Sequence, residues 1–164
     1  MTGKMPMFSY KIDTAIDIET NADAIWRVLT DFSRLDQWNP MLRNVQTDLE
    51  RGAKVRFEVL REGAKPLKLK AKIVKLAEPD ALSWRGGPKG ILAGEHYFRI
   101  ESLGEGRCRF YHGEQFSGLL LPLLKGVLKD APALYRSMNE ALKKRVEDEV
   151  GATGRVTTRP AAES

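Results

Sequence analysis

The stretch that decides the fold is residues 92–117, LAGEHYFRIESLGEGRCRFYHGEQFS. Apolar and polar side chains alternate on both sides of Gly104-Glu105-Gly106, which is the pattern of two strands joined by a tight turn. We therefore expect an antiparallel hairpin between residues 92–102 and residues 107–117. A three-residue loop would pair Leu103 with Arg107 and so set the register of the whole hairpin.

The register predicts which side chains share a face of this hairpin. Paired positions would then be Ile100 with Phe110, Phe98 with His112, and His96 with Glu114. Directly opposed side chains lie about 5 Å apart at Cβ, so both histidines and Glu114 are expected to converge on one apolar face. A slip of one residue would turn the whole set outward.

Further strand patterns lie on both sides of the hairpin. They cover residues 8–18, 45–49, 55–59, 67–76 and 82–85, and turn signals rich in glycine and proline separate the later ones. The regular spacing predicts an antiparallel meander, because short turns join antiparallel neighbours.

Three helices complete the predicted order. A short one follows Thr20 or Asn21, and a second short one runs from Asp31 to Trp38, before Asn39-Pro40. Apolar residues at steps of three and four then predict a long helix from Pro122 to about Val150, with a kink or break at Pro132. One strand, two short helices, six strands and one long helix fit a curved sheet that grips the C-terminal helix.

Composition limits the function classes. The chain has 164 residues, of which 42% are hydrophobic, so we expect one domain over residues 8–150 with disordered ends at 1–7 and 151–164. The single Cys108 excludes an intrachain disulfide and a cysteine-based zinc site, and it is expected to be a small buried hydrophobe. A membrane span needs about 20 apolar residues, and no apolar run comes near that length, so we expect a cytoplasmic protein. We also expect it to be a monomer or a weak homodimer.

The net charge of +5 is concentrated in one segment. Residues 51–75 hold nine basic and two acidic side chains, and Lys68, Lys70 and Lys72 alternate with apolar residues. In a strand these lysines share the solvent face, where they also discourage edge pairing. No aromatic residues interleave with them, so we expect no nucleic acid, whereas peripheral contact with a membrane or an acidic partner stays open.

Three segments carry a family resemblance. Residues 24–32, AIWRVLTDF, followed by Trp38-Asn39-Pro40, resemble the opening of the START-like (SRPBCC) superfamily in its polyketide cyclase/dehydrase and lipid-transport branch. Residues 112–120 and 138–143 resemble its last strand and last helix. The resemblance implies an α+β helix-grip fold, with a seven-stranded curved antiparallel sheet wrapped around the C-terminal helix and two short helices after the first strand. Pro132 departs from the family pattern.

The family fold also implies an elongated, mostly apolar cavity between the sheet and the last helix. Strand parity, helix periodicity and, for Trp38, the place of a short helix near the cavity mouth then give the candidate ligand-binding residues. They are Trp38, Phe57, Val59, Leu69, Leu82, Trp84, His96, Phe98, Phe110, His112, Glu114, Phe116, Leu128, Tyr135 and Met138. Trp26 is expected in the core, and Trp84 and Phe98 have core packing as an alternative role.

His96, His112 and Glu114 have two interpretations. In the first, they form a buried polar network whose hydrogen bonds are satisfied. In the second, they orient a polar group of a ligand or transfer protons as acid and base. The family resemblance itself implies no catalytic residue. Zinc on the same three residues is chemically possible, but pairs at strand spacing are a weak signal. We expect neither a metal nor a cofactor.

Three functions follow from these observations. The favoured one is binding of a small hydrophobic, lipid- or polyketide-like molecule in the cavity. The first alternative is a cyclase or dehydratase that uses His96, His112 and Glu114. The second is an interaction protein that uses the basic face 65–75.

Overall fold

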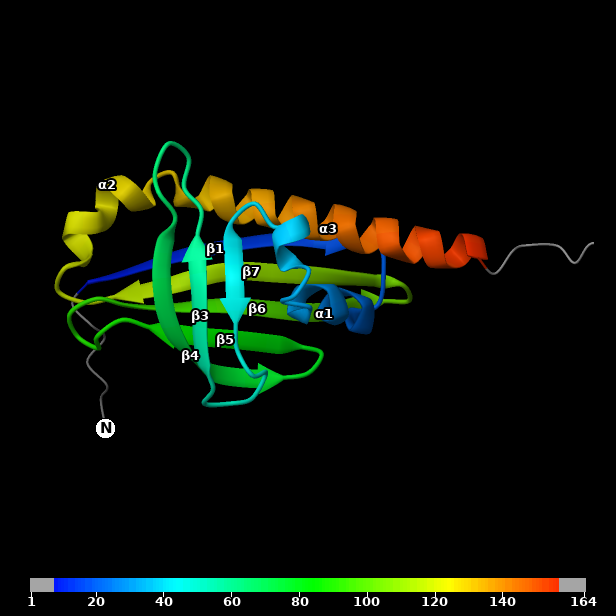
Figure 1. Cartoon of the computed structure of the whole chain (residues 1–164), viewed down its shortest axis with the longest axis horizontal. Coiled ribbons are helices and arrows are strands. Elements are labelled where there is room, and N and C mark those ends of the chain that lie inside the picture. Colours follow the sequence, from blue (N-terminus) through cyan, green and yellow to red (C-terminus); the bar gives the residue numbers. More distant parts are fainter. Residues whose placement is uncertain (1–7, 157–164) are drawn as a thin grey trace, which may run out of the picture.

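The computed structural model describes residues 8–156, and its centre is one antiparallel sheet in the order β1-β7-β6-β5-β4-β3-β2. The strands are β1 (Ser9–Ile18), β2 (Leu42–Gln46), β3 (Lys54–Val59), β4 (Leu67–Ala77), β5 (Ala81–Gly86), β6 (Ala93–Gly104) and β7 (Arg107–Ser117). Figure 1 shows the sheet curving beneath the long helix α3 (Ala131–Val156). The predicted helix-grip fold is confirmed.

The predicted register of the β6–β7 hairpin is confirmed in its body. Ile100 pairs with Phe110, Phe98 with His112, and His96 with Glu114. The turn itself differs, because Gly104 rather than Leu103 pairs with Arg107 and the register shifts between Ser102 and Gly104. Gly104 and Gly106 have φ angles of 127° and 69°, which other residues rarely adopt, so the chain turns more tightly than predicted.

The segment after β1 forms two short helices, as expected. Asn21 caps α1 (Ala22–Thr30) by accepting a hydrogen bond from the Ala24 N–H at 2.9 Å. The second helix is shorter than predicted, a 3₁₀ turn η1 (Leu35–Gln37). Asp31 accepts hydrogen bonds from the side chains of Ser33 and Arg34, so its carboxylate is engaged there instead of capping a helix.

The strand predicted at residues 45–49 lies three residues earlier, as β2. The Asn39 side chain accepts hydrogen bonds from the N–H groups of Met41 and Leu42, both at 2.8 Å, and this turn starts the strand at once. The prediction missed it because the Asn-Pro pair signals only an end of the helix and not the start of β2.

The C-terminal segment breaks before Pro132, as predicted. A 3₁₀ turn η2 (Leu121–Leu124) and a single helical turn α2 (Lys125–Leu128) precede α3, in which Pro132 is the second residue. Proline is tolerated in a first helical turn because the N–H groups there have no helical partner.

The helix continues beyond Val150, so the prediction of a tail without regular structure is wrong for residues 151–156. Ion pairs four residues apart, Lys144 with Asp148 and Arg145 with Glu149, support this end, and the Thr153 hydroxyl donates to the Glu149 carbonyl. The predicted disorder of residues 1–7 and 157–164 lies outside the described residues.

The core lies between α3 and the inner face of the sheet. Its most buried side chains include Ile18, Phe110, Met138, Leu142 and Val146, which have no exposed area. Cys108 and Trp26 are also buried, as predicted. Among residues 8–156, no helix is both long and apolar enough to cross a membrane.

Candidate functional site

The hairpin brings the two histidines together on the inner face. His96 and His112 lie on the neighbouring strands β6 and β7, and their Nε2 atoms are 2.7 Å apart. Both are buried, at 3% and 0% exposure. Figure 1 shows β7 and β6 side by side beneath α3. The helix contributes Tyr135 and Asn139 to the surroundings of the pair, and the sheet contributes Thr14, Phe98 and Phe110.

Hydrogen bonds fix the proton positions of this pair. The Thr14 hydroxyl donates to the His112 carbonyl at 2.6 Å, and the Asn139 amide nitrogen donates to the Thr14 oxygen at 2.8 Å. The Asn139 carbonyl oxygen therefore faces His112 Nδ1, at 2.9 Å, and that nitrogen must carry a proton. In the neutral ring His112 Nε2 is then an acceptor, so His96 Nε2 is the donor and His96 Nδ1 has a free lone pair.

The free lone pair of His96 faces a carboxyl group. His96 Nδ1 and Glu114 Oε2 are 4.0 Å apart, and the Tyr135 hydroxyl donates a hydrogen bond to the same oxygen. Tyr135 comes from α3, so strand and helix both position the carboxyl group. The result is a chain of polar side chains, the relay, whose members are Tyr135, Glu114, His96, His112, Asn139 and Thr14. Hydrogen bonds join its members except at the 4.0 Å step between Glu114 and His96, which is longer than a hydrogen bond.

Burial sets the charge of the relay. It lowers the pKa of His112 to about 4, although the hydrogen bond to Asn139 opposes the shift. Burial and the neighbouring His112 also hold the pKa of His96 well below its usual range. Both rings are therefore neutral at pH 7.

Glu114 behaves differently from the histidines. Burial raises its pKa to about 7, and the hydrogen bond from Tyr135 only partly opposes this shift. Its side chain remains 18% exposed, so it is the point where the relay reaches the surface. A carboxyl group that is half ionised at neutral pH suits acid–base chemistry.

Two members of the relay, Thr14 and Asn139, were not predicted. Thr14 shares the alternation of Ile12 and Ile16 in the first strand but was not named as a site residue, and Asn139 follows the predicted Met138 on the last helix. Asn139 is four residues after Tyr135, which is one helical turn, and this spacing is the signal that would have found it.

At most of the predicted site residues, the space between the sheet and the last helix is packed core and not a continuous cavity. Aromatic rings fill much of the space: the centroids of His96 and Phe98 are 4.7 Å apart, and those of His112 and Tyr135 are 4.8 Å apart. The predicted lining residues that are instead packed core have at most 8% exposure. They are Phe57, Leu82, Trp84, Phe98, Phe110, Leu128, Tyr135 and Met138.

The inner face does open at one end, beyond Glu114. Ala71, Gly86 and Gly94 lie side by side across β4, β5 and β6, and all three are partly exposed. A Cβ atom at Gly94 would lie 2.5 Å from Glu114 Oε1, so the missing side chain makes room for the carboxyl group. We call these three residues the small-residue floor.

Two other predicted residues lie next to this floor, Leu69 on β4 near Ala71 and Phe116 opposite Gly94, while Val59 lies farther along β3, opposite Leu67. Leu69 is 38% exposed, while Val59 and Phe116 are partly buried. Buried Trp84 lies next to the floor, and its ring N–H has no hydrogen-bond partner among the described residues. Trp38 is partly buried and packs against the core, but it makes no ring contact with the other aromatic side chains of residues 8–156.

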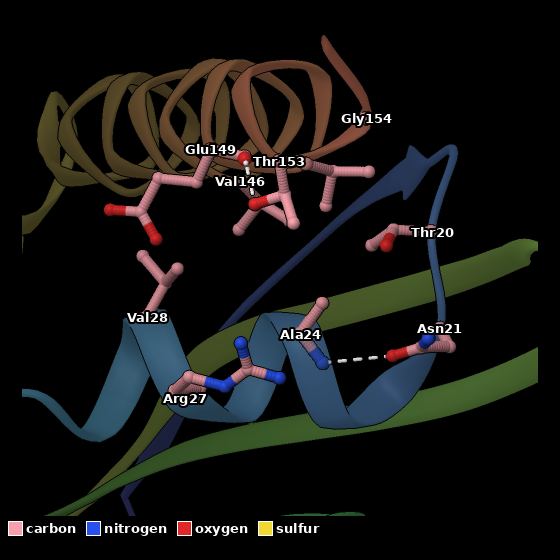
Figure 2. Close-up of a pocket in the computed structure, with 10 residues that line it drawn as sticks. Thr20, Asn21, Ala24, Arg27, Val28, Val146, Glu149, Thr153 and Gly154 are labelled. Carbon is pink, nitrogen blue, oxygen red and sulfur yellow. Dashed lines mark hydrogen bonds between the residues drawn. The ribbon is translucent and has the colours of Figure 1, made fainter. Parts of the chain in front are cut away.

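Two defined hollows lie away from the relay. One, of about 430 Å³, lies between α1 and the end of α3. Figure 2 shows Arg27, Val28, Glu149 and Thr153 around it. The other, of about 320 Å³, lies over the outer face and includes Lys11, Lys75 and Arg99. Neither includes His96, His112 or Glu114.

The zinc alternative finds no support in this geometry. His96 and His112 direct their Nε2 atoms at each other, which engages both in a hydrogen bond. In the part of the chain that the structure describes, no group of three or more histidine, cysteine, aspartate or glutamate residues could hold a metal ion.

The predicted basic face is broader than one strand. Lys68, Lys70 and Lys72 are exposed on β4, as expected. On β3, Arg56 pairs with Lys70 and Lys54 with Lys72, whereas Glu58 lies opposite Lys68 with 4.0 Å between the charged atoms. This face is therefore a concentrated positive surface. Its like charges lie directly opposite each other, which destabilises the sheet slightly.

Comparison with known proteins supports the fold. A family model described as polyketide cyclase / dehydrase and lipid transport matches residues 9–147. No curated protein matches the sequence.

Solved structures with a similar fold have low sequence identity. The Zhui aromatase/cyclase from Streptomyces sp. R1128 has a TM-score of 0.69 at 16% identity, over 90% of this chain and 99% of that one. A START superfamily protein from Mycobacterium smegmatis has a TM-score of 0.66 at 20% identity, over 84% and 97%. Norcoclaurine synthase from Thalictrum flavum, in complex with dopamine and hydroxybenzaldehyde, has a TM-score of 0.65 at 14% identity, over 90% and 95%.

Proposed function

Because the chain belongs to the polyketide cyclase/dehydrase and lipid transport family, we propose that it binds a small hydrophobic molecule on the small-residue floor, with Glu114 holding a polar group of that molecule. The single observation that carries this proposal is the position of Glu114. It is the partly exposed end of a buried relay, beside three small residues of the inner face that are themselves partly exposed.

The chemistry around the floor defines the ligand class. Leu69, Val59 and Phe116 offer apolar contact, which favours a flat or chain-like apolar body. Near pH 7 Glu114 is able to donate a hydrogen bond when protonated and accept one when ionised, and the Trp84 N–H is a donor without a partner among the described residues. We infer a ligand with a carbonyl or hydroxyl group at one end.

The structural neighbours are consistent with such a ligand. One of them is an aromatase/cyclase, and another was solved with dopamine and hydroxybenzaldehyde, which are aromatic molecules that carry hydroxyl or carbonyl groups. Their identity to this chain is low, so they support the class of ligand and not a particular compound.

Binding of a neutral fluorescent probe, N-phenyl-1-naphthylamine, tests the proposal. We expect saturable binding to the wild type and a loss of about tenfold or more in affinity for Gly94→Val, because a side chain there occupies the floor and displaces the Glu114 carboxyl group. Gly126→Val, in α2 with open space at its Cβ, is the matched control and should bind like the wild type. Equal affinity in all three proteins would contradict the proposal.

Proton transfer on an enolisable carbonyl compound is the second candidate function. The observation that favours it is the relay itself, in which Glu114 is half ionised near pH 7 and His96 presents a free lone pair 4.0 Å away. An ionised Glu114 would remove a proton from the carbon next to the carbonyl group, and the neutral acid would return it. Cyclisation and dehydration both need such transfers.

Exchange of deuterium into α-tetralone separates catalysis from binding. The wild type should accelerate exchange at the carbon next to the carbonyl group, and Glu114→Gln should reduce the rate by at least about a hundredfold. Thr14→Val, which alters only the far end of the relay, should reduce it by less than about tenfold. Exchange by Glu114→Gln at the wild-type rate would exclude the acid–base role while leaving the binding function standing.

A further inference from the structure

An exposed apolar surface at one end of the sheet has no role in the proposed ligand site. It consists of the loop 87–92 and residues 118–128, which we call the apolar tip. Two backbone hydrogen bonds join these segments, from the Leu119 N–H to the Gly90 carbonyl at 3.1 Å and from the Leu120 N–H to the Ile91 carbonyl at 3.0 Å. Gly118, with a φ of 135°, permits this approach because any Cβ there would collide with the Ile91 carbonyl.

The tip exposes more apolar side chain than scattered surface residues do. Leu123 is 78% exposed, and Leu119, Val127, Ile91 and Leu120 are 44–63% exposed. Leu121 and Leu128, at 2% and 7%, face inward and fix the same short helices to the body of the protein. Apolar side chains gathered on neighbouring exposed segments mark a site of contact with a membrane, a partner protein or a ligand.

The charged side chains within the tip and next to its helical end are lysines, and the acids nearest in sequence are Glu95, Glu114 and Asp130. Residues 86–94 and 115–129 contain Lys89, Lys125 and Lys129 and no aspartate or glutamate. All three lysines are exposed. Apolar side chains flanked by lysines are the composition of segments that lie in the interface of an anionic bilayer.

We propose that the apolar tip docks on the surface of an anionic lipid bilayer, with Leu123 and Val127 entering the interface and Lys89, Lys125 and Lys129 meeting the headgroups. A second copy of this chain fits less well, because symmetric contact through the tip would bring two sets of lysines together. Figure 1 shows α2 at one extremity of the molecule, which leaves it accessible to a flat surface. The docking does not depend on a ligand binding to the floor.

Cosedimentation of the full chain with lipid vesicles tests this proposal. We expect binding to phosphatidylcholine vesicles that contain about one third phosphatidylglycerol, and at least about tenfold weaker binding to pure phosphatidylcholine. Leu123→Gln with Val127→Gln should weaken binding by about tenfold or more, because the apolar insertion is lost. Both side chains are exposed, so the fold should be unchanged by circular dichroism.

Two matched charge variants locate the surface. Lys125→Gln with Lys129→Gln should reduce binding about tenfold at low salt, whereas Lys68→Gln with Lys70→Gln, which removes the same charge from the outer face, should change it less than about threefold. The reverse order would overturn the proposal and assign docking to the basic face. A dimer in light scattering that Leu123→Gln dissociates, without vesicle binding by the wild type, would overturn it in favour of a second copy.

Discussion

The two ends of the inner face are filled in opposite ways. At the closed end, large side chains such as Phe110, Met138 and Leu142 meet between sheet and helix with no exposed area. At the open end, beyond Glu114, Ala71, Gly86 and Gly94 form a floor that is partly exposed. The relay lies at the boundary between them.

This difference separates stability from function along one surface. Filling the closed end buries apolar area and anchors α3, which is the main favourable contribution to folding. The open end buries less apolar area. Glu114 lies there, with a raised pKa and a partly exposed carboxyl group. A site that gives up stability in this way is a candidate for binding.

The largest predicted effect is a truncation at the closed end. Phe110→Ala should lower the free energy of unfolding by about 3–5 kcal/mol, because a fully buried ring leaves a cavity. Leu69→Ala at the open end should lower it by less than about 1 kcal/mol, since this side chain is 38% exposed. Urea titration of both variants checks the pair, and similar losses would remove the distinction between the two ends.

The next effect is a dependence of the free energy of unfolding on pH that is caused by Glu114. Its pKa is about 7 in the folded protein and ordinarily 4.5, so the unfolded chain ionises first as pH rises. The free energy of unfolding should therefore fall by about 3 kcal/mol between pH 4.5 and 7 through this group.

His112 changes the free energy of unfolding in the opposite direction over an overlapping pH range. His112 has a pKa of about 4 in the folded protein against 6.5, so its contribution is lost as pH falls from 6.5 towards 4. Subtracting the stability of Glu114→Gln from that of the wild type isolates the carboxyl group. A difference that stays constant with pH would contradict the assigned burial of Glu114.

A comparison of two glycines gives a smaller effect. A Cβ at Gly113 would collide with the Ile12 carbonyl and the Tyr97 ring, whereas at Gly94 it meets the end of the flexible Glu114 side chain. Gly113→Ala should cost about 1–3 kcal/mol and Gly94→Ala less than half of that, because only the second neighbour can move. Thermal unfolding measures both, and a larger loss for Gly94→Ala would mean that Glu114 is rigidly held.

The smallest effect concerns the outer face. Lys70→Glu places an acid opposite Arg56 on β3 and should raise the free energy of unfolding by about 0.5 kcal/mol at low salt. Lys75→Glu, on the same strand but opposite Ser83, is the control and should change it less. Equal changes would show that net charge, not the cross-strand pair, matters.

The comparison of the two ends also explains which features of the site could be predicted from the sequence. Strand parity and one turn were enough to place His96, His112 and Glu114 on one face, because a period of two residues leaves only two choices. Parity says nothing about how tightly that face is filled, so Phe98, Phe110 and Met138 were expected at a cavity and are packed core instead.

The floor and the far end of the relay escaped prediction for a different reason. Gly86 and Gly94 have no side chain to contribute to a periodicity, and their role depends on pairing across β5 and β6. Asn139 and Thr14 meet across 125 positions in the sequence, so only the packing of α3 on β1 brings their side chains into contact.

Titration of the Glu114 carboxyl carbon by NMR tests the central claim most directly, with Glu114→Gln identifying the signal. A carboxyl group at the boundary of the two ends, mostly buried and hydrogen-bonded by Tyr135, should titrate with a midpoint of about 7. A midpoint near 4.5 would mean that Glu114 is an ordinary solvated side chain, and it would contradict the relay as the functional centre of this protein.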